Sequence, residues 1–438
     1  MRLSIRHAYR LSIAAVAMVC LAGTGCGQVE RSAPHSATAT VAPTVTLTPS
    51  LPGAAHATFT RSQDIPGGIY GLAAASDGIA WGSGANAIWR FGPSTHAQRY
   101  SVDGFPYSLT VGSAKDLWFA LRGSGGYAIG HIALDGSMRS VPLPAGYEIS
   151  PGNVVPGPDG NLWYIATTPI FIDPQGGTFS TAFGRVTPTG SIQQFAYPHS
   201  TAGPLINTHD LAVGPDGKLW YALNQETFGQ PDANHVIQEG YAGGHVGRLT
   251  LSGSFQEFAL PNPRAIVSNI VNGPDGNVWF ADGTTQIDQI TPAGVIRTFP
   301  LPQGGESPVA GPDRNLWFFV SRPMGIERLT PTGQLTGFRP EPHLSPTGLL
   351  PEEEGNVNTL IVGADGNLWF TERPWPIIGR ITPDGDITEY WPPTTGGRTI
   401  SVLGQLAASP DGSIVYTINT YGDPTLAPES GIVGRLAP

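Results

Sequence analysis

Lysine and cysteine are scarce in this 438-residue chain. Only two lysines occur, Lys115 and Lys218, and the formal net charge is −10. Binding to a nucleic-acid backbone requires a basic stripe, and the sequence has none, so we expect no nucleic-acid partner. Both cysteines lie within the first 26 residues. The folded part of the chain therefore has no disulfide, no thiolate metal site and no cysteine nucleophile.

Residues 1–26 have the pattern of an export signal. Three arginines precede an apolar run from Leu11 to Leu21, which is too short to span a membrane comfortably. Small residues and Cys26 follow, as in bacterial lipoprotein signals, although Gly23 stands where such signals usually carry leucine. We predict an extracytoplasmic protein that is either lipidated at Cys26, and attached to the membrane only by that anchor, or secreted after cleavage of an ordinary signal peptide.

The next segment, residues 27–55, is rich in Ser, Thr, Ala and Pro and poor in large apolar side chains. Such a composition cannot form a packed core, so we predict a disordered linker. Everything that follows, residues 56–438, is predicted to form one domain.

This domain consists of a unit that recurs eight times. The fullest copy reads Val-Gly-Ala-Asp-Gly-Asn-Leu-Trp-Phe-Thr-Glu over residues 362–372 and Ile-Gly-Arg-Ile-Thr-Pro-Asp-Gly-Asp-Ile-Thr-Glu-Tyr over residues 378–390. Each copy predicts four short strands, a to d, with tight Gly-containing turns that join a to b and c to d. One aromatic position recurs in strand b, and we assign to it Trp81, Trp118, Trp163, Trp220, Trp279, Trp317, Trp369 and, in the eighth copy, Tyr416.

Repeated four-stranded units of this length are typical of β-propeller blades. The predicted fold is therefore all-β, a single propeller with eight blades, with seven blades as the alternative. We expect the strand-b tryptophans in the core between blades. The eighth copy ends at strand c, and residues 56–62 have the character of a strand d. We predict that this N-terminal strand completes the last blade, which would otherwise have a bare edge.

The long insertions all fall on one face of such a propeller. In a radial blade, b–c loops and d–a links lie on the face opposite the short a–b and c–d turns. The four long segments are of these two kinds: 166–182, 223–244, 339–356 and 419–430. Long loops on a rigid scaffold usually carry binding, so we place function on this long-loop face. The expected partner there is a small molecule, a glycan or a protein, and we expect the protein to be a monomer.

Polar side chains are expected at the mouth of the central channel on the same face. The starts of the a strands line it, at Tyr70, Tyr107, Gly152, His209, Ser268, Glu306, Asn358 and Gly404. The ends of the b strands add Asp282, Glu372 and Asn419. His209, Asp282, Glu306 and Glu372 are candidate metal ligands for Mg²⁺ or Ca²⁺, because they combine imidazole and carboxylate groups. His209 and Glu372 are also the candidate catalytic residues.

Three phrases of the repeat resemble the virginiamycin B lyase family, the streptogramin lyases. They are Gly-Pro-Asp-Gly-Asn-Leu-Trp, Trp369-Phe-Thr-Glu372 and Ile-Gly-Arg-Ile-Thr-Pro-Asp-Gly from residue 378. The resemblance covers residues 56–438. It implies a seven-bladed propeller that uses magnesium and a general base to open a cyclic antibiotic by elimination across a C–O bond.

The resemblance also implies four functional positions: a His at the start of one strand a, a Glu-x-His at the start of the next, and the acid of Trp-Phe-Thr-Glu. In units four and five, His209 matches the first position and Asp282 the acid, but Ile266 and Ser268 replace the Glu and the base His.

In units six and seven Glu372 matches, while Glu306, Asn356 and Asn358 stand at the other positions. A serine alone cannot act as the base at neutral pH, so we favour an extracytoplasmic ligand-binding or scaffold module. The alternatives are a metal-dependent C–O lyase or a related hydrolase, and a protein-interaction platform.

Overall fold

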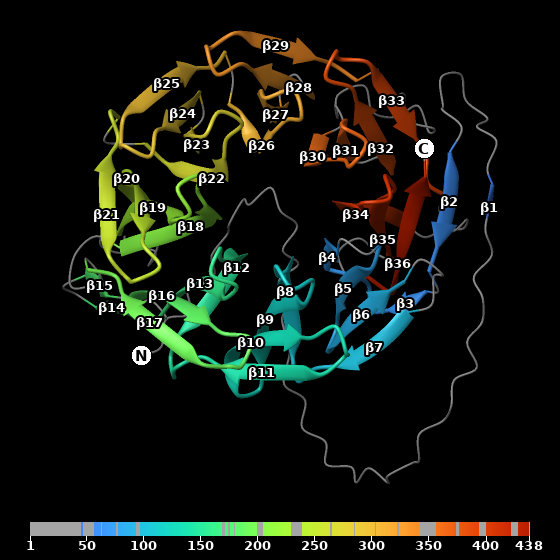
Figure 1. Ribbon diagram of the computed structural model, residues 1–438, viewed down its shortest axis with the longest axis horizontal. Coiled ribbons are helices and arrows are strands. Elements are labelled where there is room, and N and C mark those ends of the chain that lie inside the picture. Colours follow the sequence, from blue (N-terminus) through green and yellow to red (C-terminus); the bar gives the residue numbers. More distant parts are fainter. Residues whose placement is uncertain are drawn as a thin grey trace, which may run out of the picture.

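The computed structural model describes residues 45–46 and 57–437, except 63, 76–77, 93–96, 169–170, 174–175, 179, 199–204, 229–238, 263–264, 284, 303, 322–323, 341–355, 374–375, 394–399 and 422–427. Within these residues the strands form eight radial sheets around a central axis (Figure 1). The prediction of eight blades is confirmed, and the seven-blade alternative is wrong. The predicted signal in residues 1–26 and most of the linker lie outside the described residues. No helix in the described part of the chain has the length and apolar character to span a membrane.

Each blade is an antiparallel sheet, and in blades one to seven the strands follow the chain order from the axis outward. Blades one to four contain β4 (Gly71–Ala74), β5 (Ala80–Gly84), β6 (Ala87–Phe91), β7 (Ala97–Ser101); β8 (Phe105–Val111), β9 (Leu117–Gly123), β10 (Gly126–Ile132), β11 (Met138–Pro142); β12 (Glu148–Pro156), β13 (Leu162–Thr167), β16 (Thr181–Val186), β17 (Ile192–Ala196); and β18 (Leu205–Val213), β19 (Leu219–Phe228), β20 (Glu239–Leu249), β21 (Phe255–Ala259). A small hairpin of β14 (Phe171–Asp173) and β15 (Gly176–Thr178) lies in the b–c loop of blade three.

Blades five to eight repeat the arrangement. They contain β22 (Val267–Asn272), β23 (Val278–Asp282), β24 (Gln286–Ile290), β25 (Ile296–Pro300); β26 (Glu306–Ala310), β27 (Leu316–Ser321), β28 (Met324–Leu329), β29 (Leu335–Phe338); β30 (Asn356–Val362), β31 (Leu368–Arg373), β32 (Ile377–Ile381), β33 (Ile387–Tyr390); and β34 (Ile400–Ala408), β35 (Ile414–Tyr421), β36 (Ser430–Ala437). The innermost strands of neighbouring blades contact one another all the way round, including β34 with β4, so the ring is closed.

The N-terminal segment completes blade eight, as predicted. β2 (Thr58–Arg61) pairs antiparallel with β36, with Phe59 opposite Leu436, and β3 (Ile65–Pro66) pairs with the start of β36. Phe59 is buried and its ring meets Tyr416 edge-on at 6.2 Å. Within the predicted linker, β1 (Val45–Thr46) pairs with β2 at the outer edge of the blade (Figure 1).

The strand-b tryptophans fill the space between blades, as predicted. All seven are at most 2% exposed. In five blades the strand-d aromatic residue stacks on its own blade's tryptophan at 5.0–5.6 Å, in the pairs Trp163–Phe195, Trp220–Phe258, Trp279–Phe299, Trp317–Phe338 and Trp369–Tyr390. These rings supply much of the apolar burial that a single blade could not achieve alone.

Blade eight differs from the sequence interpretation by one residue. In blade seven Trp369 pairs with Arg380. In blade eight the partner of the corresponding Arg435 is Val415 and not Tyr416. The assignment of Tyr416 to the tryptophan position is therefore wrong. A valine fills that position, and Tyr416 takes the place of the aromatic residue that follows the tryptophan.

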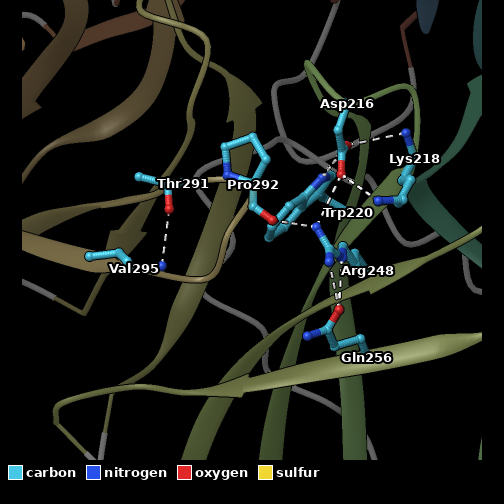
Figure 2. A network of polar contacts seen from close by, with 8 residues as sticks. All are labelled: Asp216, Lys218, Trp220, Arg248, Gln256, Thr291, Pro292 and Val295. Atoms are coloured by element: carbon cyan, nitrogen blue, oxygen red, sulfur yellow. Dashed lines mark hydrogen bonds and ion pairs between the residues drawn. The ribbon is translucent and has the colours of Figure 1, made fainter.

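The arginine of the Ile-Gly-Arg phrase joins neighbouring blades on the turn face. In blade four, Arg248 donates hydrogen bonds to Asp216 at 3.2 Å and to the carbonyl of Pro292 in the next blade's c–d turn (Figure 2). The Trp220 indole N–H donates to the same Asp216 carboxylate at 2.9 Å. Burial tends to raise the pKa of Asp216, but the hydrogen bond from Trp220 and the hydrogen bonds and charge of Lys218 outweigh it and hold the pKa below its ordinary value.

The same contact to a turn carbonyl of the following blade recurs at other junctions. The donors and acceptors are Arg185 to Leu251, Arg328 to Pro383, and Arg435 to Gly78. The turn face is thus occupied by structural contacts. The long insertions leave from the opposite ends of the strands, since they join β13 to β16, β19 to β20, β29 to β30 and β35 to β36.

Candidate functional site at the channel mouth

The predicted rim of the channel mouth occupies one register position in the innermost strands. In each blade one residue of strand a pairs with the tryptophan position of strand b. The rim residue stands three positions before that residue in strand a. This holds for Tyr70, Tyr107, Gly152, His209, Ser268, Glu306, Asn358 and Gly404. The sequence alignment of the eight a strands is therefore correct at this position.

A β-bulge next to the rim bends most of these strands. The register shifts between residues 107 and 110, 149 and 154, 208 and 210, 268 and 271, 306 and 309, 357 and 359, and 403 and 406. Ser108, Asn269 and Ser307 adopt φ values of 50°, 55° and 48° there. Such left-handed conformations are uncommon for residues other than glycine and often occur at functional sites.

The bulge residues connect the blades across the inner ring. The Asp210 carboxylate accepts a hydrogen bond from the Asn269 backbone N–H of the next blade. Gln405 Oε1 accepts one from the Leu72 N–H at 2.7 Å. Burial raises the pKa of Asp210 to about 6, although the backbone N–H groups of Asn269 and Ile270 oppose the rise. Asp210 and Gln405 thus serve as structural links between blades at the mouth.

Aromatic side chains gather at one side of the mouth, on blades eight, one and two. The rings of Tyr70 and Phe105 lie 5.0 Å apart, and Phe105 is 40% exposed. Burial and the nearby Tyr421 raise the pKa of Tyr70. Tyr107 is held in place, because its hydroxyl donates to the Ile149 carbonyl at 2.6 Å. Phe105 is a large apolar group at the channel mouth that is available to a ligand.

Blade five contributes a pair of buried carboxylates. Asp282 ends β23, is 3% exposed and accepts a hydrogen bond from Gln286. Asp288 on β24 is fully buried. Burial raises the pKa of Asp288 to about 6; the Thr298 hydroxyl opposes the rise and the charge of Asp282 adds to it. Burial also raises the pKa of Asp282, and the hydrogen bond from Gln286 opposes that rise.

Asp288 was not found from the sequence, although a signal for it exists. In blade seven Gly379 lies opposite Phe370, and a Cβ at that glycine would overlap the ring. Asp288 occupies the corresponding position in blade five, and Glu327 occupies it in blade six. A buried acid in place of a required glycine, in two neighbouring copies, is the departure from the repeat that would have revealed both residues.

The four candidate metal ligands lie on four successive blades, four to seven. His209 lies on β18, but its side chain is outside the described residues. Glu306 begins β26 opposite Phe319, and Glu372 lies on β31 opposite Val357. Among the described side chains, no group of three or more His, Cys, Asp or Glu residues is placed to hold a metal ion. The metal site of His209, Asp282, Glu306 and Glu372 therefore stays a prediction.

Glu372 does not face solvent, as a metal ligand at an open channel mouth would. Its side chain is fully buried. Burial, and in addition the charge of Glu389, raises the pKa of Glu372 to about 8. The carboxyl group is therefore largely protonated at neutral pH, a state that favours hydrogen-bond donation over metal binding.

At the position where the resemblance implies a base, the structure has Ser268. Its hydroxyl accepts a hydrogen bond from the Asn269 side chain at 3.2 Å. Ile266, at the position of the expected Glu, is 36% exposed. The two positions thus present a hydroxyl and an apolar side chain.

Two comparisons with known proteins place the chain in a family. The model of the virginiamycin B lyase family matches residues 58–228 and 231–359. A virginiamycin B lyase from Nocardia farcinica (strain IFM 10152) is 30% identical over 315 residues, which cover 72% of this chain and 77% of that protein. The chain belongs to the virginiamycin B lyase family.

Solved structures of this family are more distant. A streptogramin B lyase has 22% identity and a TM-score of 0.47, with 86% of this chain and 96% of that chain covered. A catalytically inactive virginiamycin B lyase from Staphylococcus aureus with quinupristin has 24% identity and a TM-score of 0.49, with coverage of 76% and 94%. The C-terminal WD40 domain of Sif2 has 10% identity and a TM-score of 0.54, with coverage of 87% and 98%, and shares the fold alone.

Proposed function

We propose that this member of the virginiamycin B lyase family binds a ligand at the channel mouth without performing the elimination reaction. The observation that carries the proposal is Ser268, which occupies the base position. Proton abstraction needs a group with a pKa near the working pH, and a serine hydroxyl does not have one. Ile266 is exposed and stands where the resemblance implies a Glu, so a second polar group is absent next to the same strand.

The mouth is suited to a ligand with an aromatic or apolar face. Phe105 and Tyr70 form an aromatic side, and Ile266 adds apolar surface on blade five. Aromatic groups held on a rigid scaffold contribute large contact areas at low entropic cost. A cyclic peptide antibiotic of the streptogramin type is a reasonable first probe of this surface.

Incubation of the full-length protein with quinupristin and Mg²⁺ tests the proposal. We expect binding by calorimetry and, after prolonged incubation, no conversion of the ligand to its ring-opened isomer, which has the same mass and is separated by reversed-phase chromatography. The Phe105→Ala variant should bind at least severalfold more weakly, because truncation of an interface aromatic typically costs about 1–3 kcal/mol. Binding that is indifferent to Phe105→Ala would place the ligand elsewhere.

The second candidate function is a metal-dependent C–O lyase. It is favoured by the 30% identity to a virginiamycin B lyase and by Asp282 at the acid position. Mg²⁺-dependent opening of the quinupristin ring by the wild-type protein would establish this candidate and contradict the first. The double variant Ile266→Glu, Ser268→His is the positive control for a restored site.

We further propose that the protein acts outside the cytoplasm, held by lipid at Cys26. The apolar run of residues 11–21 and the small residues before Cys26 support this. Fatty-acid labelling of the wild type, lost in Cys26→Ser, is the expected result. Equal labelling of both proteins, or of neither, would contradict lipidation.

A further inference from the structure

At several junctions between blades a single residue closes the outer side of the ring. It follows strand d directly, and at four junctions it is large and at most 9% exposed: Leu143, Tyr197, Leu260 and Leu301. At three of them the N–H donates to a carbonyl at or just before the start of strand c of the same blade: Leu143 to Tyr127 at 2.9 Å, Tyr197 to Thr181 at 3.0 Å and Leu301 to Thr285 at 2.8 Å. We call it the plug residue.

The junction between blades one and two has a smaller plug. Val102 makes the same backbone hydrogen bond, to the Asn86 carbonyl at 3.1 Å, so it is the equivalent residue. It is only partly buried. Proline follows each of the four large plugs, whereas Asp103 and Gly104 follow Val102. The segment that joins β7 to β8 then lies directly against β9, since a Cβ at Gly104 would overlap the Arg122 carbonyl.

A pocket of about 250 Å³ lies beside Val102, and we call it the junction pocket. Phe119, Leu121 and Ala128 form its buried surface, and Met138 and Pro142 of β11 line its outer side. The pocket therefore opens between the outer strands β7, β10 and β11, which Figure 1 shows at the rim of the ring, and not in the channel.

The polar groups around the junction pocket already have partners. The Asp103 carboxylate accepts from the Ser124 hydroxyl at 2.8 Å, and Arg139 donates to the Pro188 carbonyl at 3.2 Å. The Tyr127 hydroxyl donates to Glu148 at 3.3 Å. A charged ligand would gain little from these groups and would lose its own hydration. The pocket is therefore suited to a neutral ligand.

The volume limits the ligand to one ring. Pockets for drug-sized molecules measure about 300–1,000 Å³, whereas an engineered apolar cavity of about 150 Å³ binds benzene. The 250 Å³ of the junction pocket lie between these values. Phe119, Tyr127 and the Met138 sulfur offer ring and thioether contacts that favour an aromatic group. We propose that the junction pocket binds one neutral aromatic ring, of phenol to indole size.

Indole binding to the full-length protein with ¹³C-methyl-labelled methionine tests the proposal. The chain has four methionines, of which Met138 lines the pocket and Met324 begins β28 in blade six. We expect a saturable shift of the Met138 methyl signal and none at Met324. Shifts of both signals that grow without saturation would overturn the proposal.

Plug variants separate the junction pocket from other surfaces. Val102→Tyr introduces the plug that blade three already has as Tyr197, and it should weaken indole binding at least tenfold while raising the melting temperature. Val102→Leu is the milder variant and should weaken binding at least threefold, which decides the matter if Val102→Tyr does not fold. Leu301→Val is the matched control at another junction, and it should leave the Met138 response unchanged. Wild-type affinity in a folded Val102→Tyr or Val102→Leu protein would overturn the proposal.

Discussion

Buried carboxylates distinguish individual copies of the repeat from one another. Asp288 and Glu327 stand where five of the other six blades have glycine, and Glu372 is fully buried at the end of a strand b. A buried carboxyl group avoids the cost of desolvation by staying protonated. Asp288 and Glu372 therefore make the stability of the propeller depend on pH well above the ordinary range of carboxyl groups.

Glu372→Gln should remove an alkaline loss of stability. The folded pKa of Glu372, about 8, lies above its ordinary value of 4.5. The proton that it binds thus stabilises the fold fully below about pH 4.5, and this stability is lost as the pH rises through about 8. Glutamine imitates the protonated group, so between pH 5 and pH 9 the wild type should lose more than ~1 kcal/mol relative to the variant.

Urea unfolding of both proteins at pH 5, 7 and 9 measures this difference. Glu389→Gln is the control, because removal of the neighbouring charge should lower the pKa of Glu372 and reduce the wild-type loss. Parallel stability curves for the wild type and Glu372→Gln would show that Glu372 does not titrate differently in the folded and unfolded states.

At the scale of strands, two asparagines link neighbouring blades on the long-loop face. Asn419 on β35 donates to the Ile69 carbonyl and accepts from the Ile69 N–H, both at 2.8 Å. Asn224 on β19 makes the same pair of bonds to Val267, at 2.8 and 2.7 Å. The residue opposite each asparagine is a glycine, whose Cβ would crowd the asparagine oxygen.

Asn419→Ala should destabilise the closed ring by ~2 kcal/mol, because it leaves a buried N–H and a buried carbonyl without partners. Asn224→Ala is the matched variant at an interior junction, where Val267 is likewise buried. Guanidinium unfolding should give similar losses for both. A loss below ~0.5 kcal/mol in either variant would mean that water replaces the asparagine there.

The sequence predicted the strands and turns well, because each copy carries Gly-containing turns and a recurring aromatic residue. It could not predict the asparagine links, since Asn224 and Asn419 lie next to insertions whose lengths conceal the register. Tyr416 was misplaced because the repeat suggested an aromatic residue at the position that Val415 fills. Asp288 lies in the middle of a strand c, so the polar residues at the strand ends do not indicate it.

At the scale of the whole molecule, the two ends of the chain meet in one blade. β2 is the outer neighbour of β36, so the ring is closed by strand pairing between residues 58–61 and 434–437. The Ser62 hydroxyl also accepts a hydrogen bond from the Val433 N–H at 3.0 Å. No covalent link is needed, which agrees with a folded domain that contains no cysteine.

Removal of the closing strand should therefore open the ring. A chain that begins at residue 63 leaves β36 with an unpaired edge and removes the buried Phe59 ring, and exposed edges promote association between chains. We expect this variant to elute as dimers or larger assemblies in size-exclusion chromatography and to melt at least ~5 °C below a chain that begins at residue 57. A synthetic peptide of residues 56–62 should restore the monomer, because pairing and burial, and not chain connectivity, close the propeller. A monomeric chain with unchanged melting temperature would show that blade eight is stable with three strands.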